Sequence, residues 1–298
     1  MNMKNLIALC VVAFVVAADA SAQTAKAPSL ASLSTQPSMN VFRRFAVDRA
    51  KMTAFYGDVL GLKPMAPIGL GGGAQMIRFQ VGTSEIKLQA TPAASEYKSG
   101  PVRDVTGLRV LTFFFPDEAA LTARFVQQGY AAPVFQNGRN GKRVAMVLDP
   151  ESQWVELVIA PGAPASTYES LEVGLTVSDL EKSRAFYRQF VGLDELPPVV
   201  DSLLGTTKYP FRHGTTTVNV WSFGPELPAN TRSAGIQYVI TDVEAVDALA
   251  KAQAVKIDTP LGNFSAGLRT IWLSDPDGIT NYFAQIVRNP QSTGASSR

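Results

Sequence analysis

Hydrophobic and polar residues follow helical and strand spacings in a fixed order along the chain. Apolar residues recur every three or four positions after Asp48, which is typical of one face of a helix that begins at Asp48 and ends at Gly61. The members of this apolar face are Met52, Phe55, Tyr56, Val59 and Leu60. Residues 75–81 and 84–89 alternate apolar and polar side chains, so we expect two half-buried strands there.

The same order of spacings restarts three more times. Further helices are predicted at 117–128, 179–191 and 242–253. Further strands are predicted at 41–47, 108–115, 143–148, 154–159, 171–177, 206–211, 216–223, 236–241, 269–273 and 281–286. We therefore expect four copies of strand, helix and two or three strands, which is an α+β arrangement.

A sequence repeat joins these four modules into two units. Segments 48–62 and 179–193 share Asp, Lys, Ala, Phe, Tyr, Gly and Leu at one constant offset. Asp149-Pro150 and Asp275-Pro276 form a second matching pair. The predicted organisation is a signal peptide (1–22), a disordered linker (23–40), a first unit (41–160), a Pro- and Ala-rich linker (161–167), a second unit (168–287) and a disordered tail (288–298).

The N-terminal segment has the pattern of an export signal. Lys4 precedes the apolar run 6–18, which leads into the small residues Ala20-Ser21-Ala22. The run is too short for a membrane-spanning helix, so after cleavage we expect no membrane association and a periplasmic or secreted protein. Cleavage also removes Cys10, the one cysteine of the chain, so the mature protein forms no disulfides.

The charge of the chain argues against a nucleic-acid partner. The chain has 27 Lys and Arg against 25 Asp and Glu, and its basic residues form no cluster interleaved with aromatic ones. We therefore expect no nucleic-acid partner and look for a small-molecule site.

The repeated segments resemble a known family, the vicinal oxygen chelate superfamily, which includes glyoxalase I, bleomycin-resistance proteins and extradiol dioxygenases. The resemblance rests on 177–183 with Ala185-Phe186-Tyr187 and Gly192-Leu193, on their first-unit counterparts, and on the Asp-Pro-Asp-Gly turn at 275–278. It implies paired βαβββ modules whose curved sheets form clefts. It also implies a divalent metal held in a cleft by His and Glu side chains on the first and last strands of the modules.

This chain departs from the family's ligand pattern. In the first unit the four ligand positions carry Val41, Lys87, Val110 or Leu108, and Glu156. In the second unit they carry Glu172, Asn219, Ile236 and Tyr282. In the first unit Glu156 is the one match, and the usual His/Glu set is incomplete in both units, so the resemblance implies a degenerate metal site.

Glu156 and Glu172 are the candidate catalytic residues and the candidate metal ligands. If the second and third modules pair across the linker, both carboxylates point into one cleft together with Asn219. Two carboxylates and an amide suit a divalent metal (Mg, Mn, Fe or Zn), or alternatively a metal-free acid/base pair in which one pKa is raised. A solvated strand position is the plain alternative for either glutamate.

Four residues are candidates for substrate binding: Asn219 in this cleft, and Tyr282, Lys87 and His213 elsewhere. Tyr282 and Lys87 belong to the other cleft, beside Val41 and Ile236, where a phenol and an ammonium can bind ligand oxygens. His213 lies beside a turn and is a candidate general base above a cleft, with a surface position as the alternative.

Two function classes follow. The first is an enzyme of lyase, isomerase or dioxygenase-like type acting on a small oxygenated metabolite. The alternative is a metal-independent protein that binds and sequesters a small molecule, as bleomycin-resistance proteins do. A tandem satisfies within one chain the module pairing that shorter members obtain by dimerising, so we expect a monomer.

Overall fold

The computed structural model describes residues 29–46, 48–71, 74–91, 101–138, 141–229, 233–265 and 267–287. The predicted signal peptide, Cys10 and the tail 288–298 lie outside these ranges. Within them, no helix has the length and apolar character that a membrane crossing needs.

The first unit contains two modules in chain order. The first module comprises β1 (Asn40–Phe45), α1 (Arg49–Ala54), a π-helical turn (Phe55–Val59), β2 (Lys63–Gly71), β3 (Ala74–Val81) and β4 (Ser84–Ala90). The second comprises β5 (Gly107–Phe115), α2 (Glu118–Gln127), β6 (Gln136–Asn137), β7 (Arg143–Leu148) and β8 (Trp154–Ile159).

The second unit repeats this order after a one-turn helix, α3 (Ala165–Tyr168), which lies across the end of the predicted linker. The third module comprises β9 (Leu171–Thr176), α4 (Leu180–Ala185), a π-helical turn (Phe186–Val191), β10 (Asp194–Glu195), β11 (Val199–Asp201), β12 (Thr206–His213) and β13 (Thr216–Trp221). The fourth comprises β14 (Ala234–Val239), α5 (Val243–Ala252), β15 (Ile257–Ser265), β16 (Leu268–Ser274) and β17 (Thr280–Ile286). The predicted α+β fold of four modules in two tandem units is confirmed.

An aspartate begins each of the four main helices. Asp117, Asp179 and Asp242 each accept a hydrogen bond from the backbone N–H three residues on, at 3.0–3.1 Å. Asp48 caps α1 in the same way through the N–H of Ala50. Each cap satisfies a backbone donor that the first helical turn leaves without a partner, which is why the sequence pattern located the helix starts well.

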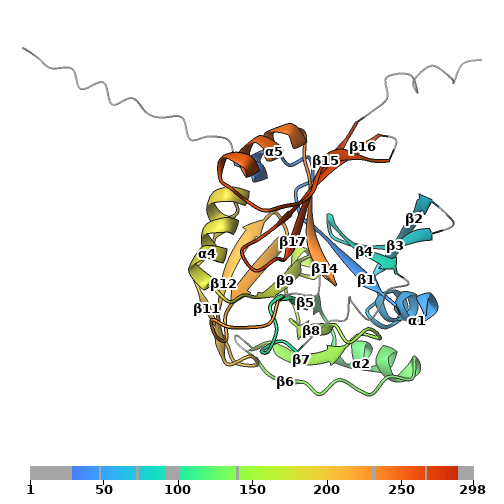
Figure 1. The fold of residues 1–298 in the computed structure, drawn as a ribbon. Helices are drawn as coiled ribbons and strands as arrows, with labels where there is room; N and C mark the ends of the chain where they lie inside the picture. Colours follow the sequence, from blue (N-terminus) through green and yellow to red (C-terminus); the bar gives the residue numbers. More distant parts are fainter. Residues whose placement is uncertain are drawn as a thin grey trace, which may run out of the picture.

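The modules pair across the units. The first and fourth modules form an eight-stranded sheet in the order β15-β16-β17-β14-β1-β4-β3-β2. The second and third form a nine-stranded sheet in the order β10-β12-β13-β9-β5-β8-β7-β6, with the ninth strand, β11, paired to β12 beside this path (Figure 1). The condition on which the Glu156–Glu172 hypothesis depended is therefore met, because β5 and β9 are antiparallel neighbours.

Residues 29–40 correct one prediction. We expected a solvated linker, but Leu30–Leu33 form a 3-10 helix and Leu30 is buried. The N–H of Thr35 donates to the carbonyl of Val239 at 2.8 Å, so this segment packs on the fourth module. Its Ala, Ser and Pro composition hid this because the contacts are tertiary and have no sequence period.

Two buried aspartates join the sheets. The Tyr56 hydroxyl donates to Asp149 Oδ2 at 2.9 Å, and the fully buried Arg43 pairs with the same oxygen. In the second unit the Tyr187 hydroxyl donates to Asp275 Oδ2 at 2.9 Å. In each case the tyrosine and the aspartate belong to modules of different sheets, so these contacts fix one sheet against the other.

Replacing Asp149 by Asn is expected to lower the free energy of unfolding by about 3–5 kcal/mol, because the buried Arg43 guanidinium loses its counter-charge. Urea unfolding followed by circular dichroism measures the loss. Glu118→Gln is the matched control: it breaks the part-exposed ion pair with Arg143, which should cost less than about 1 kcal/mol. Equally small losses in both variants would contradict the buried-pair interpretation.

Asp275 predicts a pH dependence of stability. Burial raises its pKa from 3.8 to about 7, although the backbone N–H of Ile279 acts in the opposite direction. Between those pH values the folded protein holds a proton that the unfolded chain has released. This contribution to stability is complete below about pH 4 and is lost as the pH rises through about 7.

Asp275→Asn should remove that fall. The difference in free energy of unfolding between wild type and variant is measured by urea unfolding from about pH 4.5 to about pH 8. We expect wild type to lose stability relative to the variant as the pH rises. A difference that stays constant across this range would show that the carboxyl titrates normally.

Candidate functional site

Strand alternation places two glutamates and a threonine in one row on the concave face of the nine-stranded sheet. Thr112 on β5 lies in register with Glu156 on β8 and with Glu172 on β9. Registered neighbours point to the same face, and adjacent strands are about 4.8 Å apart. The Thr112 hydroxyl donates to Glu156 Oε2 at 2.8 Å.

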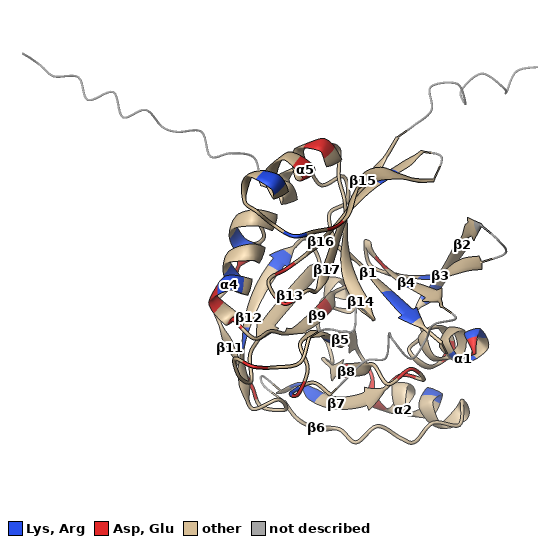
Figure 2. Cartoon of the chain, in the orientation of Figure 1, with Lys and Arg blue, Asp and Glu red and all other residues tan. Residues whose placement is uncertain are grey.

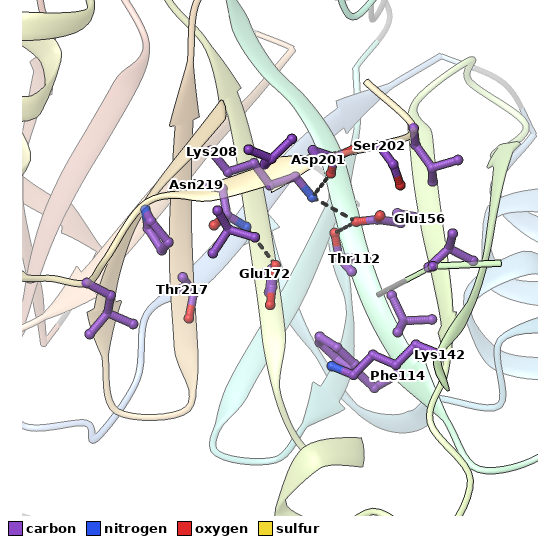
Figure 3. A pocket seen from close by; sticks show the side chains of 18 residues that line it. Thr112, Phe114, Lys142, Glu156, Glu172, Asp201, Ser202, Lys208, Thr217 and Asn219 are labelled. Carbon is purple, nitrogen blue, oxygen red and sulfur yellow. Dashed lines mark hydrogen bonds and ion pairs between the residues drawn. The ribbon is translucent and has the colours of Figure 1, made fainter. Parts of the chain in front are cut away.

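A cavity of about 320 Å³ lies over this row. Asn219 on β13 lines it beside Glu172 and donates to Glu172 Oε2 at 2.6 Å. Leu196, Val199 and the segment 200–203 line it as well and bring apolar side chains to its wall. Figure 3 shows both glutamates and the amide directed toward the same space.

Lys208 is a buried cation of this cavity. Its ammonium on β12 lies 2.5 Å from Asp201 Oδ2 and 3.4 Å from Glu156 Oε2 (Figure 3). Only 11 % of the Lys208 side chain is exposed. Burial acts to lower the pKa of the ammonium, but the charges of Glu156, Asp201 and Glu172 outweigh it, so the pKa is raised and Lys208 stays charged.

Glu172 has the opposite balance. Burial raises the pKa of its carboxyl above the ordinary glutamate value, and the nearby charge of Glu156 adds to this. Lys208, the Asn219 amide and Lys142 act to lower it without cancelling the effect. The cavity therefore holds a carboxyl whose pKa is moved toward neutrality beside a permanently charged ammonium, and perturbed groups of this kind mark functional sites.

Trp221 lies two residues beyond Asn219 on β13, on the same face of the sheet. A Cβ atom built on Gly174 would lie 2.0 Å from the Trp221 ring, so the ring lies directly on the glycine backbone. Trp221 forms a small apolar cluster with Val102, Val110 and Leu204. This cluster fills part of the concave face and leaves the polar part, with Glu156 and Glu172, as the open cavity.

The structure separates the sequence-predicted residues into two groups. Glu156, Glu172 and Asn219 lie together in this cavity. Lys87 and Tyr282 lie on the concave face of the other sheet, where the Lys87 ammonium donates to Gln237 Oε1 at 2.5 Å and Tyr282 is 6 % exposed.

His213 is outside both groups. It ends β12 in register with Thr216 and is half-buried, and burial lowers the pKa of its imidazole. The cavity lining contains Lys208 and Pro210 from this strand but not His213. A general-base role for His213 in this cavity therefore has no geometric support.

For two ligand positions in the other sheet, the sequence-based prediction was wrong by one residue. Val41 and Ile236 lie in register with each other and are buried in the main core, on the face away from the cleft. In this sheet the row across neighbouring strands is Asn40, Gln237 and Tyr282. In the other sheet the equivalent row is Glu172, Thr112 and Glu156. Asn40 and Gln237 are therefore the true counterparts, and they carry amides.

Sequence reasoning missed Lys208, Asp201, Thr112 and Lys142, all of which line the cavity. The strand that carries Lys208 was predicted from the sequence. Lys208 lies two residues before Pro210 on that strand, so both side chains point to the same face. Its partner Asp201 lies on the short strand β11, which has no sequence pattern of its own. The pairing between the two could not be found without the fold.

The residues of this cavity do not fit a divalent metal. Glu156, the ligand position that matches the family, already accepts from Thr112 and faces the Lys208 ammonium. A dication bound there would lie against that fixed positive charge. Throughout the described ranges, no three His, Cys, Asp or Glu side chains are grouped to hold a metal ion.

Comparisons with known proteins agree with the fold. Glyoxalase I from Zea mays gives a TM-score of 0.62 at 17% identity, covering 83% of this chain and 92% of that one. A putative dioxygenase from Bacillus subtilis gives 0.59 at 14% identity, covering 85% and 86%. No curated protein sequence matches the chain.

A sequence model of the glyoxalase/bleomycin resistance protein/dioxygenase superfamily matches residues 38–157 and 170–283, one segment in each unit. These segments cover most of the described residues and contain both sheets. The chain is therefore a tandem member of the glyoxalase/bleomycin resistance protein/dioxygenase superfamily.

Proposed function

We propose that this protein is an exported enzyme of isomerase or lyase type that moves a proton on a small carbonyl-containing metabolite, without a metal ion. One observation carries the proposal. The carboxyl of Glu172, with its raised pKa, shares a cavity with the ammonium of Lys208, which Glu156 and Asp201 hold in place.

Glu172 is the proposed base. Its carboxylate takes a proton from the carbon next to the substrate carbonyl, and the C–H electron pair forms a C=C bond while the carbonyl π electrons move onto oxygen. A carboxyl whose pKa is moved toward the working pH is suited to both halves of such a transfer. In the isomerase case the same carbon carries a hydroxyl: the hydroxyl proton passes to the first oxygen, a new C=O bond forms at this carbon, and the C=C electrons take the proton from Glu172 at the former carbonyl carbon. In the lyase case the first carbonyl re-forms, the C=C bond shifts to the next carbon, and a group there leaves with its bonding electrons.

Lys208 is the proposed electrophile. Its ammonium stabilises the negative charge that develops on the substrate oxygen, in a site with little access to water. In related metal-dependent sites a cation polarises the substrate oxygen as a Lewis acid. Here Glu156 and Asp201 fix the ammonium before substrate arrives, so little reorganisation is needed during the reaction.

The size and lining of the cavity favour a small substrate. Its volume of about 320 Å³ is at the lower end of the usual range for ligand sites, roughly 300–1,000 Å³. Lys142 stands at its edge, with its ammonium 5.5 Å from the centroid of the Phe114 ring. These residues suit a compact oxygenated compound with a polar and an apolar end.

A metal-independent binding protein is the second candidate. The observation that favours it is the apolar cover provided by Leu196, Val199, Val200 and Leu203, which suits retention of a ligand as well as catalysis. In that case Lys208 and Asn219 would orient the ligand and no bond would break.

The proposed setting follows from the N-terminal sequence and from the charge distribution. The segment before residue 23 supports export. Figure 2 shows acidic and basic residues interspersed over the helices and strands, which supports a small-molecule partner over a nucleic acid. Each sheet is completed by modules of one chain, which supports a monomer.

Glu172→Gln is expected to lower the proton-transfer rate by about 10²–10⁴-fold, because the amide cannot accept the proton. The rate is measured by NMR as deuterium uptake from D₂O into a panel of small α-hydroxy ketones, α-hydroxy aldehydes and α-keto acids. Glu244→Gln, on α5, is the control and should retain the wild-type rate. Saturable binding of panel members without any exchange would favour the binding protein instead.

Manganese is expected to leave the thermal stability of the wild-type protein unchanged, because the Lys208 ammonium already balances Glu156. Differential scanning fluorimetry with increasing Mn²⁺, after dialysis against EDTA, measures this. A saturable rise in Tm that disappears in both Glu156→Gln and Glu172→Gln would show that the cavity binds a metal after all.

A further inference from the structure

Lys142 is a second ammonium at the cavity of Glu172, and the proposed reaction does not use it. It lines the cavity just before β7 and is half-buried. Its charge is one of those that lower the pKa of Glu172, so the ammonium lies within electrostatic reach of that carboxyl. In the part of the chain that the structure describes, the ammonium takes part in no hydrogen bond or ion pair. Its contact is with the Phe114 ring, whose centroid is 5.5 Å away, which leaves N–H donors for a ligand.

The other polar groups of the cavity are already engaged with one another. The Lys208 ammonium pairs with Asp201 and Glu156, and the Asn219 amide donates to Glu172. Of the two lysines that line the cavity, Lys142 is therefore the one left to bind a negatively charged group of a ligand.

Three rows of side chains cross the concave face along β5. Val110, Thr112 and Phe114 alternate onto this face, and Thr112 belongs to the row of Glu156 and Glu172. Val110 and Phe114 are four residues apart on one strand, so the outer rows are about 13 Å apart. The row of the two glutamates lies midway between them.

The two lysines reach the glutamate row from opposite sides. The Lys208 ammonium lies 5.7 Å from the centroid of the Trp221 ring, which packs with the Val110 row. Lys142 lies over Phe114, in the row on the other side. Figure 3 shows the same order, with Glu172 between the two lysines. A ligand that binds both ammoniums must therefore pass Glu172.

The Phe114 row itself is apolar. Val158 on β8 lies in register with Phe114 on one side and with Val144 on the other, and all three side chains line the cavity. Methylene groups of a ligand can pack on this row while a charged end binds the ammonium of Lys142. The lining thus suits a short hydrocarbon segment that ends in an anion.

A carboxylate suits this end of the cavity better than a phosphate. The lining contains three carboxyl groups, Glu156, Glu172 and Asp201. A phosphate dianion would be repelled by these groups and would have one ammonium to balance two charges. A carboxylate carries a single charge, which Lys142 balances through charge-assisted hydrogen bonds.

We propose that the substrate is an oxo acid whose carboxylate binds Lys142 while its carbonyl oxygen binds Lys208. This inference rests on the proposed function, because it assigns a substrate class to the same site. The carbon that gives its proton to Glu172 then lies between the carbonyl and the carboxylate. A γ-oxo acid has this order, with two methylene carbons between the two groups.

Isothermal titration calorimetry with 4-oxopentanoate and 5-hydroxypentan-2-one tests the assignment. Both compounds are methyl ketones of similar size, but the second ends in an uncharged hydroxyl. We expect saturable binding of 4-oxopentanoate that is at least tenfold weaker in Lys142→Gln and is retained in Lys142→Arg. The hydroxy ketone should bind wild type at least tenfold more weakly than 4-oxopentanoate does, and Lys142→Gln should not weaken it further.

Lys251→Gln is the matched control. Its ammonium pairs with Asp247 on α5, outside the cavity, so both affinities should stay at the wild-type value. Absence of saturable 4-oxopentanoate binding, or equal affinity in wild type and Lys142→Gln, would overturn the proposal.

Deuterium uptake from D₂O at carbon 3 of 4-oxopentanoate separates this inference from the proposed reaction. Binding that depends on Lys142 without any uptake would support the carboxylate contact and contradict proton transfer by Glu172. Uptake with the same kcat/KM in wild type and Lys142→Gln would support proton transfer and overturn the role of Lys142.

Discussion

The fold depends on a hydrogen bond from a buried tyrosine to a buried aspartate, made once in each unit. Tyr56 meets Asp149 and Tyr187 meets Asp275, and each contact joins a helix of one sheet to a turn of the other. The two modules of one unit therefore lie in different sheets. Each sheet is completed by a module of the other unit. That exchange is what places β5 beside β9, and with it two glutamates in one cleft.

The repeat made much of this predictable. The Phe-Tyr pair after each capping aspartate and the two Asp-Pro turns were visible as sequence, and they are the two ends of each buried contact. Strands β2 and β15 were not predicted, because edge strands with Pro and Gly have weak alternation. The packing of Leu30 was missed for another reason: its contacts are with a module that lies far away in the sequence.

The site residues that closely follow a turn were the ones that could be placed from the sequence. Glu156 and Tyr282 were placed correctly from Asp149 and Asp275, since a short turn fixes the register of the next strand. Val41 was misplaced because the two units differ in spacing by one residue. Asn40, which faces the cleft, precedes the start of α1 by one residue more than Glu172 precedes the start of α4. A shift of one residue moves a side chain to the opposite face. Lys208 was out of reach, because its role exists only through Asp201 and Glu156 in space.

The account rests on the claim that Glu172 is an acid/base group beside a fixed ammonium. A ¹³C NMR titration of the glutamate carboxyl carbons, with the Glu172 signal assigned from its loss in Glu172→Gln, tests this most directly. We predict that the pKa of Glu172 lies above the ordinary glutamate range and rises further in Lys208→Gln, because the Lys208 charge lowers it in the wild type. A pKa for Glu172 at or below the ordinary range, unmoved by the loss of Lys208, would contradict the account.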